Sequence, residues 1–177
     1  MNKIYESEKQ WTTLESYSNQ LIVSLVNIEQ RLPILMNTQE ENWDNLDLFP
    51  DLPKLLVQKH IQSCENLLVE VRKNLTTFEQ LKTLILSLSD QLDSLTEMIS
   101  EDVDIDSVCW LTNISTNFLT ISQCLLHTSQ MSKKIVASYF SKEELITKIT
   151  KIGHSETEKD WKKLSKICDK WVSLSYK

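Results

Sequence analysis

The chain has 177 residues, 41% of them hydrophobic and 25% charged, with a formal net charge of −6. This composition fits one globular domain with a substantial core. The only glycine is Gly153, which argues against glycine-rich phosphate loops and tight hairpins, because those turns need a residue without a Cβ atom. The N-terminus has no apolar leader, and no stretch holds the roughly 18 uncharged apolar residues of a membrane span, so we expect a soluble intracellular protein.

Residues 1–36 predict a first helix. Apolar and small residues recur three and four apart along it, the spacing of a coiled-coil seam: Trp11, Leu14, Ser18, Leu21, Leu25, Ile28, Leu32 and Leu35. Pro33 is expected to kink or end this helix, because proline lacks a backbone N–H. Residues 37–51 then form a connector with five acidic groups and no Lys or Arg, which we expect Trp43 and Phe49 to hold against the body.

Residues 52–100 predict one long helix. Asp51 can cap its start, and Pro53 falls in its first turn, where the missing N–H costs nothing. Its seam contains Leu56, His60, Cys64, Leu67, Val71, Leu75, Phe78, Leu81, Ile85, Leu88, Leu92, Leu95 and Ile99. A helix of this size reaches about 70 Å, so we expect part of it to form a coiled-coil-like arm unless it breaks.

Residues 107–140 predict a third helix, packed antiparallel on the long one. Two S-x-x-E capping boxes, Ser141 with Glu144 and Ser155 with Glu158, predict two short helices within 142–175, divided at Gly153. No strand pattern occurs. We therefore expect a single all-α domain over 1–177, an antiparallel helical bundle with a long coiled-coil-like hairpin.

The sequence contains no recognisable catalytic or metal-binding motif. Cys64, Cys109, Cys124 and Cys168 form no C-x-x-C pair, so we expect reduced thiols rather than a zinc site or a disulfide framework. Asp104 and Asp106 have no apolar or basic neighbours that would separate their pKa values for acid–base catalysis. We predict no catalytic site, cofactor, metal or small-molecule substrate, and a protein that works by binding other proteins.

Charge is concentrated at the C-terminal end. Residues 83–132 hold no basic and seven acidic groups, whereas residues 133–177 hold eleven basic and six acidic ones. The last helix carries five lysines on one side and an apolar set on the other: Lys159, Lys162, Lys163, Lys166 and Lys170 against Trp161, Leu164, Cys168 and Trp171.

This last helix allows two interpretations. In one, it is docked by its tryptophans and its lysines are merely solvated. In the other, the lysines meet acidic protein or RNA phosphate, or the tryptophans anchor a partner. Candidate partner-binding residues are Trp161, Trp171, Lys162 and Lys166, together with Trp110 at the start of the third helix.

The block Leu48-Phe49-Pro50-Asp51-Leu52, followed by Leu55 and Lys59, resembles the AIRIM family of ribosome maturation factors. The resemblance covers most of the chain and is strongest in its first half. It continues through Trp11, Leu14, Leu25, Glu29-Gln30 and Leu32, and through Trp110-Leu111, Ile114, Lys133-Lys134, Leu145 and Trp161. The stretch from Phe118 to Met131 departs from the family pattern, which is richer in Tyr, Lys and Arg. We interpret Phe49, Pro50, Asp51 and Leu52 as a structural motif that fixes the entry into the long helix.

The resemblance implies a non-catalytic adaptor that works in the cytoplasm and the nucleus. Its partners would be AAA+ ATPases of the spermatogenesis-associated type and a second small helical protein, the cyclin-dependent-kinase-interacting one. Such a complex acts in large ribosomal subunit maturation and in replication-linked protein turnover. Through it, the chain would associate indirectly with pre-ribosomes. Two rivals remain open. One is a structural coiled-coil component of a kinetochore, tether or cytoskeletal assembly, and the other is a helical RNA-binding module that uses the lysine face.

Overall fold

The computed structural model describes residues 2–37, 51–102, 121–152 and 158–174, and every regular element in these ranges is a helix. Helix α1 spans Asn2–Asn37, α2 spans Leu52–Asp102, α4 spans Ile121–Ile152 and α5 spans Glu158–Ser173. The predicted all-α fold is confirmed. None of these helices combines the length and the hydrophobicity needed to cross a bilayer.

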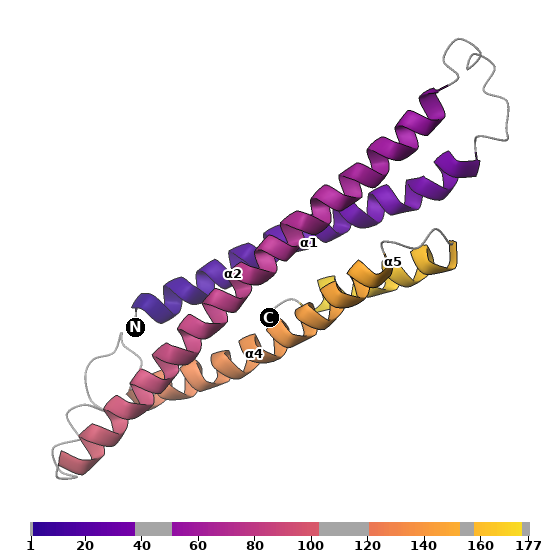
Figure 1. Ribbon diagram of the computed structural model, residues 1–177. Coiled ribbons are helices and arrows are strands. Elements are labelled where there is room, and N and C mark those ends of the chain that lie inside the picture. Colours follow the sequence, from indigo (N-terminus) through magenta and orange to yellow (C-terminus); the bar gives the residue numbers. More distant parts are fainter. Residues whose placement is uncertain (1, 38–50, 103–120, 153–157, 175–177) are drawn as a thin grey trace.

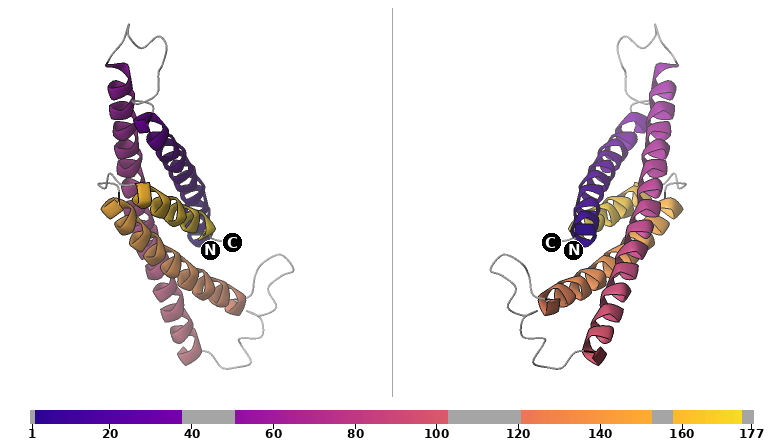
Figure 2. Two further views of the ribbon diagram at one scale, coloured as in Figure 1. Left: turned by 90° about the vertical axis from the view of Figure 1, so that its right-hand side faces the viewer. Right: turned by 90° about the vertical axis from the view of Figure 1, so that its left-hand side faces the viewer.

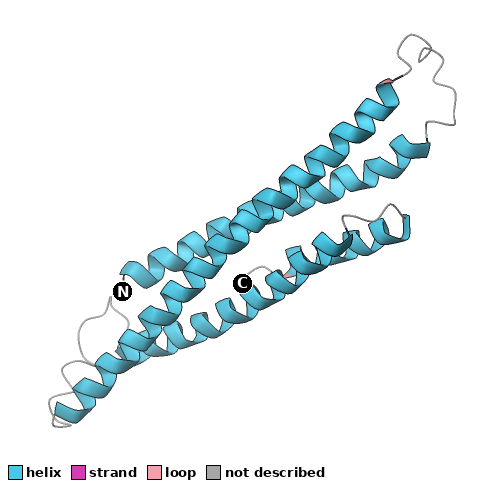
Figure 3. Cartoon of the chain, in the orientation of Figure 1, coloured by secondary structure: helices cyan, strands magenta, loops and turns pink. Residues whose placement is uncertain are grey.

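The four helices form an elongated body (Figure 1). α1 and α2 run antiparallel as one pair, and α4 and α5 form a second antiparallel pair (Figure 3). α4 packs on α2 and α5 packs on α1, so the second pair lies along the first. Views from the two sides show α2 as the longest element, extending past its neighbours at one end (Figure 2).

Helix α2 begins at the predicted place. Asp51 stands at the N-cap position, where its carbonyl oxygen accepts a 3.0 Å hydrogen bond from the Leu55 backbone N–H. Pro53 lies in the first turn, and the helix continues for 51 residues, about 75 Å at 1.5 Å per residue. The predicted seam is buried at Cys64, Val71, Phe78, Leu81 and Ile85. Phe49 and Pro50 of the structural motif fall outside the described residues.

Pro33 does not end α1, because the helix continues through it to Asn37. Proline removes one N–H from the helical ladder, so the carbonyl of Glu29, four residues earlier, loses its usual donor. Neighbouring turns that pack on α2 outweigh that loss. The acidic connector that follows falls mostly outside the described residues.

One predicted boundary is wrong. The Ser141–Glu144 capping box lies in the interior of α4, which runs unbroken to Ile152. The box matches a local pattern, but buried positions continue across it from Tyr139 through Leu145 to Ile149. Continued burial against the other helices keeps the chain helical. Residues 107–120 of the predicted third helix, and Ser155 of the second box, lie outside the described residues.

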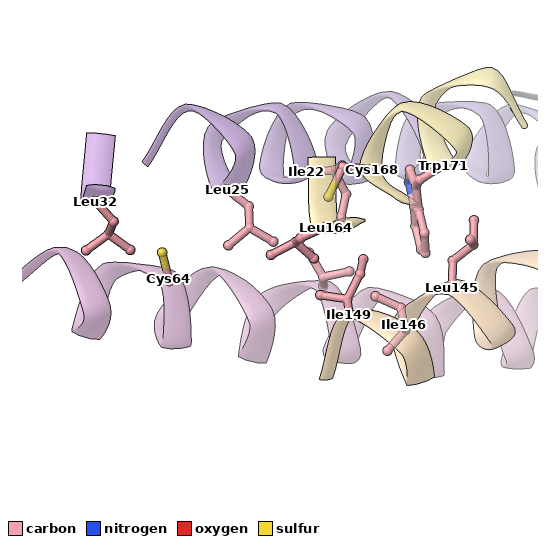
Figure 4. Close-up of a cluster of buried hydrophobic side chains, with 11 residues drawn as sticks. Ile22, Leu25, Leu32, Cys64, Leu145, Ile146, Ile149, Leu164, Cys168 and Trp171 are labelled. Carbon is pink, nitrogen blue, oxygen red and sulfur yellow. The ribbon is translucent and has the colours of Figure 1, made fainter. Parts of the chain in front are cut away.

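The core consists of two clusters along the body. The larger one joins all four helices (Figure 4): Ile22, Leu25 and Leu32 of α1, Cys64 and Val71 of α2, Leu145, Ile146 and Ile149 of α4, and Leu164, Cys168 and Trp171 of α5. The second cluster joins α1, α2 and α4 through Trp11, Phe78, Leu81, Ile85, Met131, Ile135 and Tyr139. Trp11 and Phe78 meet edge to face with ring centroids 4.6 Å apart, a favoured aromatic geometry.

Candidate partner-binding surfaces

Helix α5 is docked on the body by its apolar side. Leu164, Cys168 and Trp171 are buried, whereas Lys163, Lys166 and Lys170 are exposed. The helix packs on both α1 and α4. Among the side chains that the structure describes here, the apolar side of α5 is covered by its own chain and the lysine side is exposed.

Trp171 is a core residue. Its side chain is fully buried, and its ring centroid lies 5.5 Å from the Lys142 ammonium nitrogen. The ring therefore packs inside the protein, and the prediction that Trp171 belongs to a partner-binding surface is wrong. Among the other predicted contacts, Lys166 is exposed on α5. Trp161 and Lys162 belong to α5, but their side chains, like the whole of Trp110, lie outside the described residues.

A buried ion pair ties the two helix pairs together. The Lys142 ammonium of α4 donates a hydrogen bond to the Glu15 carboxylate of α1 at 2.7 Å, and both side chains are almost completely buried. The same nitrogen donates to Ser138 Oγ at 3.0 Å and to the carbonyl oxygen of Leu174 at 3.3 Å. Three acceptors around one ammonium group offset much of the cost of removing it from water.

Sequence reasoning missed this ion pair. The Ser141–Glu144 capping box predicts a helix start beside Lys142, whereas Lys142 continues the buried positions of α4 between Ser138 and Leu145. Glu15 likewise lies between Trp11 and Ser18 on the buried side of α1. The sequence offered one signal for this pair, a charged residue within each of the two apolar stripes.

A second buried polar contact lies near the ion pair. The Asn74 side-chain amide of α2 donates a hydrogen bond to Ser18 Oγ of α1 at 3.1 Å. Ser18 is one helical turn from Glu15. Polar contacts of this kind disfavour shifted packing, because a shift would leave buried donors and acceptors unpaired. We therefore expect this polar layer to fix how the helices align.

Glu29 is an isolated carboxyl in the larger core cluster. Burial raises its pKa to about 8, and its Oε2 atom has no hydrogen-bond partner among the described residues. Burial, and then the proximity of Glu29, raise the pKa of the Cys64 and Cys168 thiols to about 12. Both cysteines are free and stay protonated near neutral pH. No group of His, Cys, Asp and Glu suited to a metal ion occurs among the described residues.

The C-terminal half of α2 presents a different surface. Leu84 and Leu86 are exposed there, next to the exposed carboxylates of Asp90, Asp93 and Glu97. The sequence has no Lys or Arg between Lys82 and Lys133, so this part of α2 itself carries only acidic charges. Such a surface attracts basic groups.

Comparison with known proteins gives the family. A family model described as "CA109-like: Ribosome biogenesis protein C1orf109-like" matches residues 1–177. The chain belongs to this family. C1orf109-like proteins are the AIRIM family, so the resemblance carried by the Leu48–Leu52 block is confirmed. A search of curated proteins found no match. The family description assigns this C1orf109-like chain to ribosome biogenesis and names no reaction.

Proposed function

We propose that this chain is a non-catalytic adaptor subunit of an AAA+ ATPase complex that matures the large ribosomal subunit and also serves replication-linked protein turnover. ATP hydrolysis belongs to the ATPase subunits, and a second small helical protein, the cyclin-dependent-kinase-interacting one, completes the complex. The adaptor works in the cytoplasm and the nucleus. Its association with pre-ribosomes is through the complex.

The observation that carries the proposal is the long, partly uncovered α2 in a ribosome biogenesis protein. The helix spans 51 residues, and its C-terminal half exposes Leu84 and Leu86 beside acidic groups. Exposed leucines on a helix favour contact with another protein, because covering them removes apolar surface from water. The buried ion pair between Glu15 and Lys142 supports the same role, since it helps to hold the helices as one scaffold.

The lysine face of α5 supports a second contact. Lys163, Lys166 and Lys170 are exposed along one side of a helix whose other side is buried. A row of ammonium groups favours an acidic protein surface. Because RNA phosphate would also be attracted, salt dependence distinguishes the two, since phosphate contacts weaken steeply as salt rises.

The test is affinity purification of the tagged chain from cells, at low and at high salt, with mass spectrometry of the bound proteins. We expect spermatogenesis-associated AAA+ ATPases and the small helical companion in both preparations. Lys166→Glu with Lys170→Glu should weaken the ATPase contact, whereas the matched pair Lys148→Glu with Lys151→Glu on α4 should not. Recovery of the chain with itself or with cytoskeletal proteins alone would establish the structural coiled-coil alternative instead.

A further inference from the structure

Beyond the exposed charges of Lys3, Glu6 and Lys9 in its first turns, the outward side of α1 is almost free of charge. Twelve of its residues between Gln10 and Ile34 are exposed, and Arg31 alone among them is charged: Gln10, Thr12, Thr13, Ser16, Tyr17, Gln20, Val23, Ser24, Asn27, Gln30, Arg31 and Ile34. α2 differs, with Glu65, Arg72, Lys73 and Glu79 exposed within four turns. Solvated helix faces are normally charged, whereas the centres of protein interfaces are depleted of charge.

Seven of these exposed residues recur three and four apart: Thr13, Ser16, Gln20, Val23, Asn27, Gln30 and Ile34. We call them the outer stripe. The spacing matches that of a coiled-coil seam, and the stripe lies away from the buried side of α1, which holds Trp11, Ile22 and Leu25. From Thr13 to Ile34 the stripe spans 22 residues, about 33 Å of helix. α1 therefore has an apolar seam inside the protein and, opposite it, an exposed uncharged stripe that contains Val23 and Ile34.

Some polar groups at the outer stripe are already hydrogen bonded within the helix. The Thr13 hydroxyl donates to the Lys9 carbonyl and the Ser24 hydroxyl, beside the stripe, donates to the Gln20 carbonyl, both at 2.9 Å. Because these donors are satisfied within the helix, a partner does not have to replace their bonds to water. Val23 is 48% exposed and Ile34 is 64% exposed, so covering the stripe also buries apolar surface.

We propose that the outer stripe of α1 binds one helix of a different protein, whose contacting stripe is also uncharged. A three-four repeat over this length is matched by another helix. The seven stripe residues carry no charge, so a charged group brought against them would be desolvated without a partner among them, whereas the amides of Gln20, Asn27 and Gln30 can pair with amides or hydroxyls. The net charge of −6 disfavours a second copy of the chain. This inference rests on the proposed adaptor function and names its surface.

Site-specific photo-cross-linking in cells tests the proposal on the full chain. Benzoyl-phenylalanine replaces Val23 on the stripe or, as a control, Val69 on α2, which is 51% exposed. The Val23 probe is repeated with Ser16→Glu and Asn27→Glu, and with the matched pair Gln62→Glu and Thr76→Glu on exposed positions of α2. Circular dichroism checks that each variant keeps its helix content.

The expected result is one adduct from position 23 with a different protein, mapped to a helix with an uncharged three-four stripe. The Ser16/Asn27 pair should reduce it at least about tenfold, and the α2 pair should leave it unchanged. No adduct, an adduct with a second copy, a charged contact segment, or insensitivity to the stripe variants would overturn the inference. ATPase recovery from the same cells decides the proposed function separately, because it can persist when the position-23 adduct is lacking.

Discussion

Replacing Lys142 with Met tests the role of the buried ion pair. Lys142 and Glu15 have side chains that are 0% and 3% exposed, so the substitution leaves the Glu15 carboxylate buried without its ammonium partner. Breaking such a pair costs about 3–5 kcal/mol. For a chain of this size, that corresponds to a Tm lower by roughly 6–20 °C.

The double variant Glu15→Leu with Lys142→Met provides the decisive comparison. Removing both charges leaves no uncompensated ion, so most of the lost stability should return. Urea unfolding followed by circular dichroism measures all four free energies of unfolding of the cycle. The control is Lys148→Met, which removes an exposed pair with Glu144 on the same helix and should change little. A double variant as unstable as Lys142→Met alone would refute the reasoning.

Three further predictions follow from buried groups. Because burial raises the pKa of Glu29 to about 8, its effect on stability is most favourable below about pH 4.5 and is lost as pH rises to about 8, by about 1.4 kcal/mol per pH unit. Glu29→Gln should abolish that part of the pH dependence in urea titrations at several pH values. Identical stability–pH profiles for Glu29→Gln and the unaltered protein would contradict the prediction. Trp171→Ala should cost about 3–5 kcal/mol of stability, and loss of partner binding without a change in Tm would return Trp171 to a surface role. Cys64 and Cys168, buried with pKa values of about 12, should react with a thiol reagent only on unfolding, and rapid reaction in native buffer would contradict their burial.

Much of the fold could be predicted from the sequence. The near absence of glycine and the three-four spacing identified α1 and α2, and Trp11, Val71 and Phe78 are buried where the seams placed them. The error at Ser141 has a physical cause. A capping box is a local signal, while the continuation of α4 depends on burial against distant helices.

The sequence does not show which surfaces bind a partner. An amphipathic helix such as α5 shows which side is apolar, but the sequence does not say whether its own chain or another protein covers that side. Trp171 is covered by its own chain. Glu15, Glu29 and Lys142 were missed because charged residues interrupt the apolar pattern, and their burial depends on tertiary partners.

The adaptor role is tested most directly by sedimentation of the reconstituted AAA+ ATPase and its small helical companion with precursors of the large ribosomal subunit, with and without this chain. We predict that the ATPase sediments with the precursors only when the chain is present, and that the chain alone hydrolyses no ATP. Equal sedimentation of the ATPase without the chain would contradict the adaptor role.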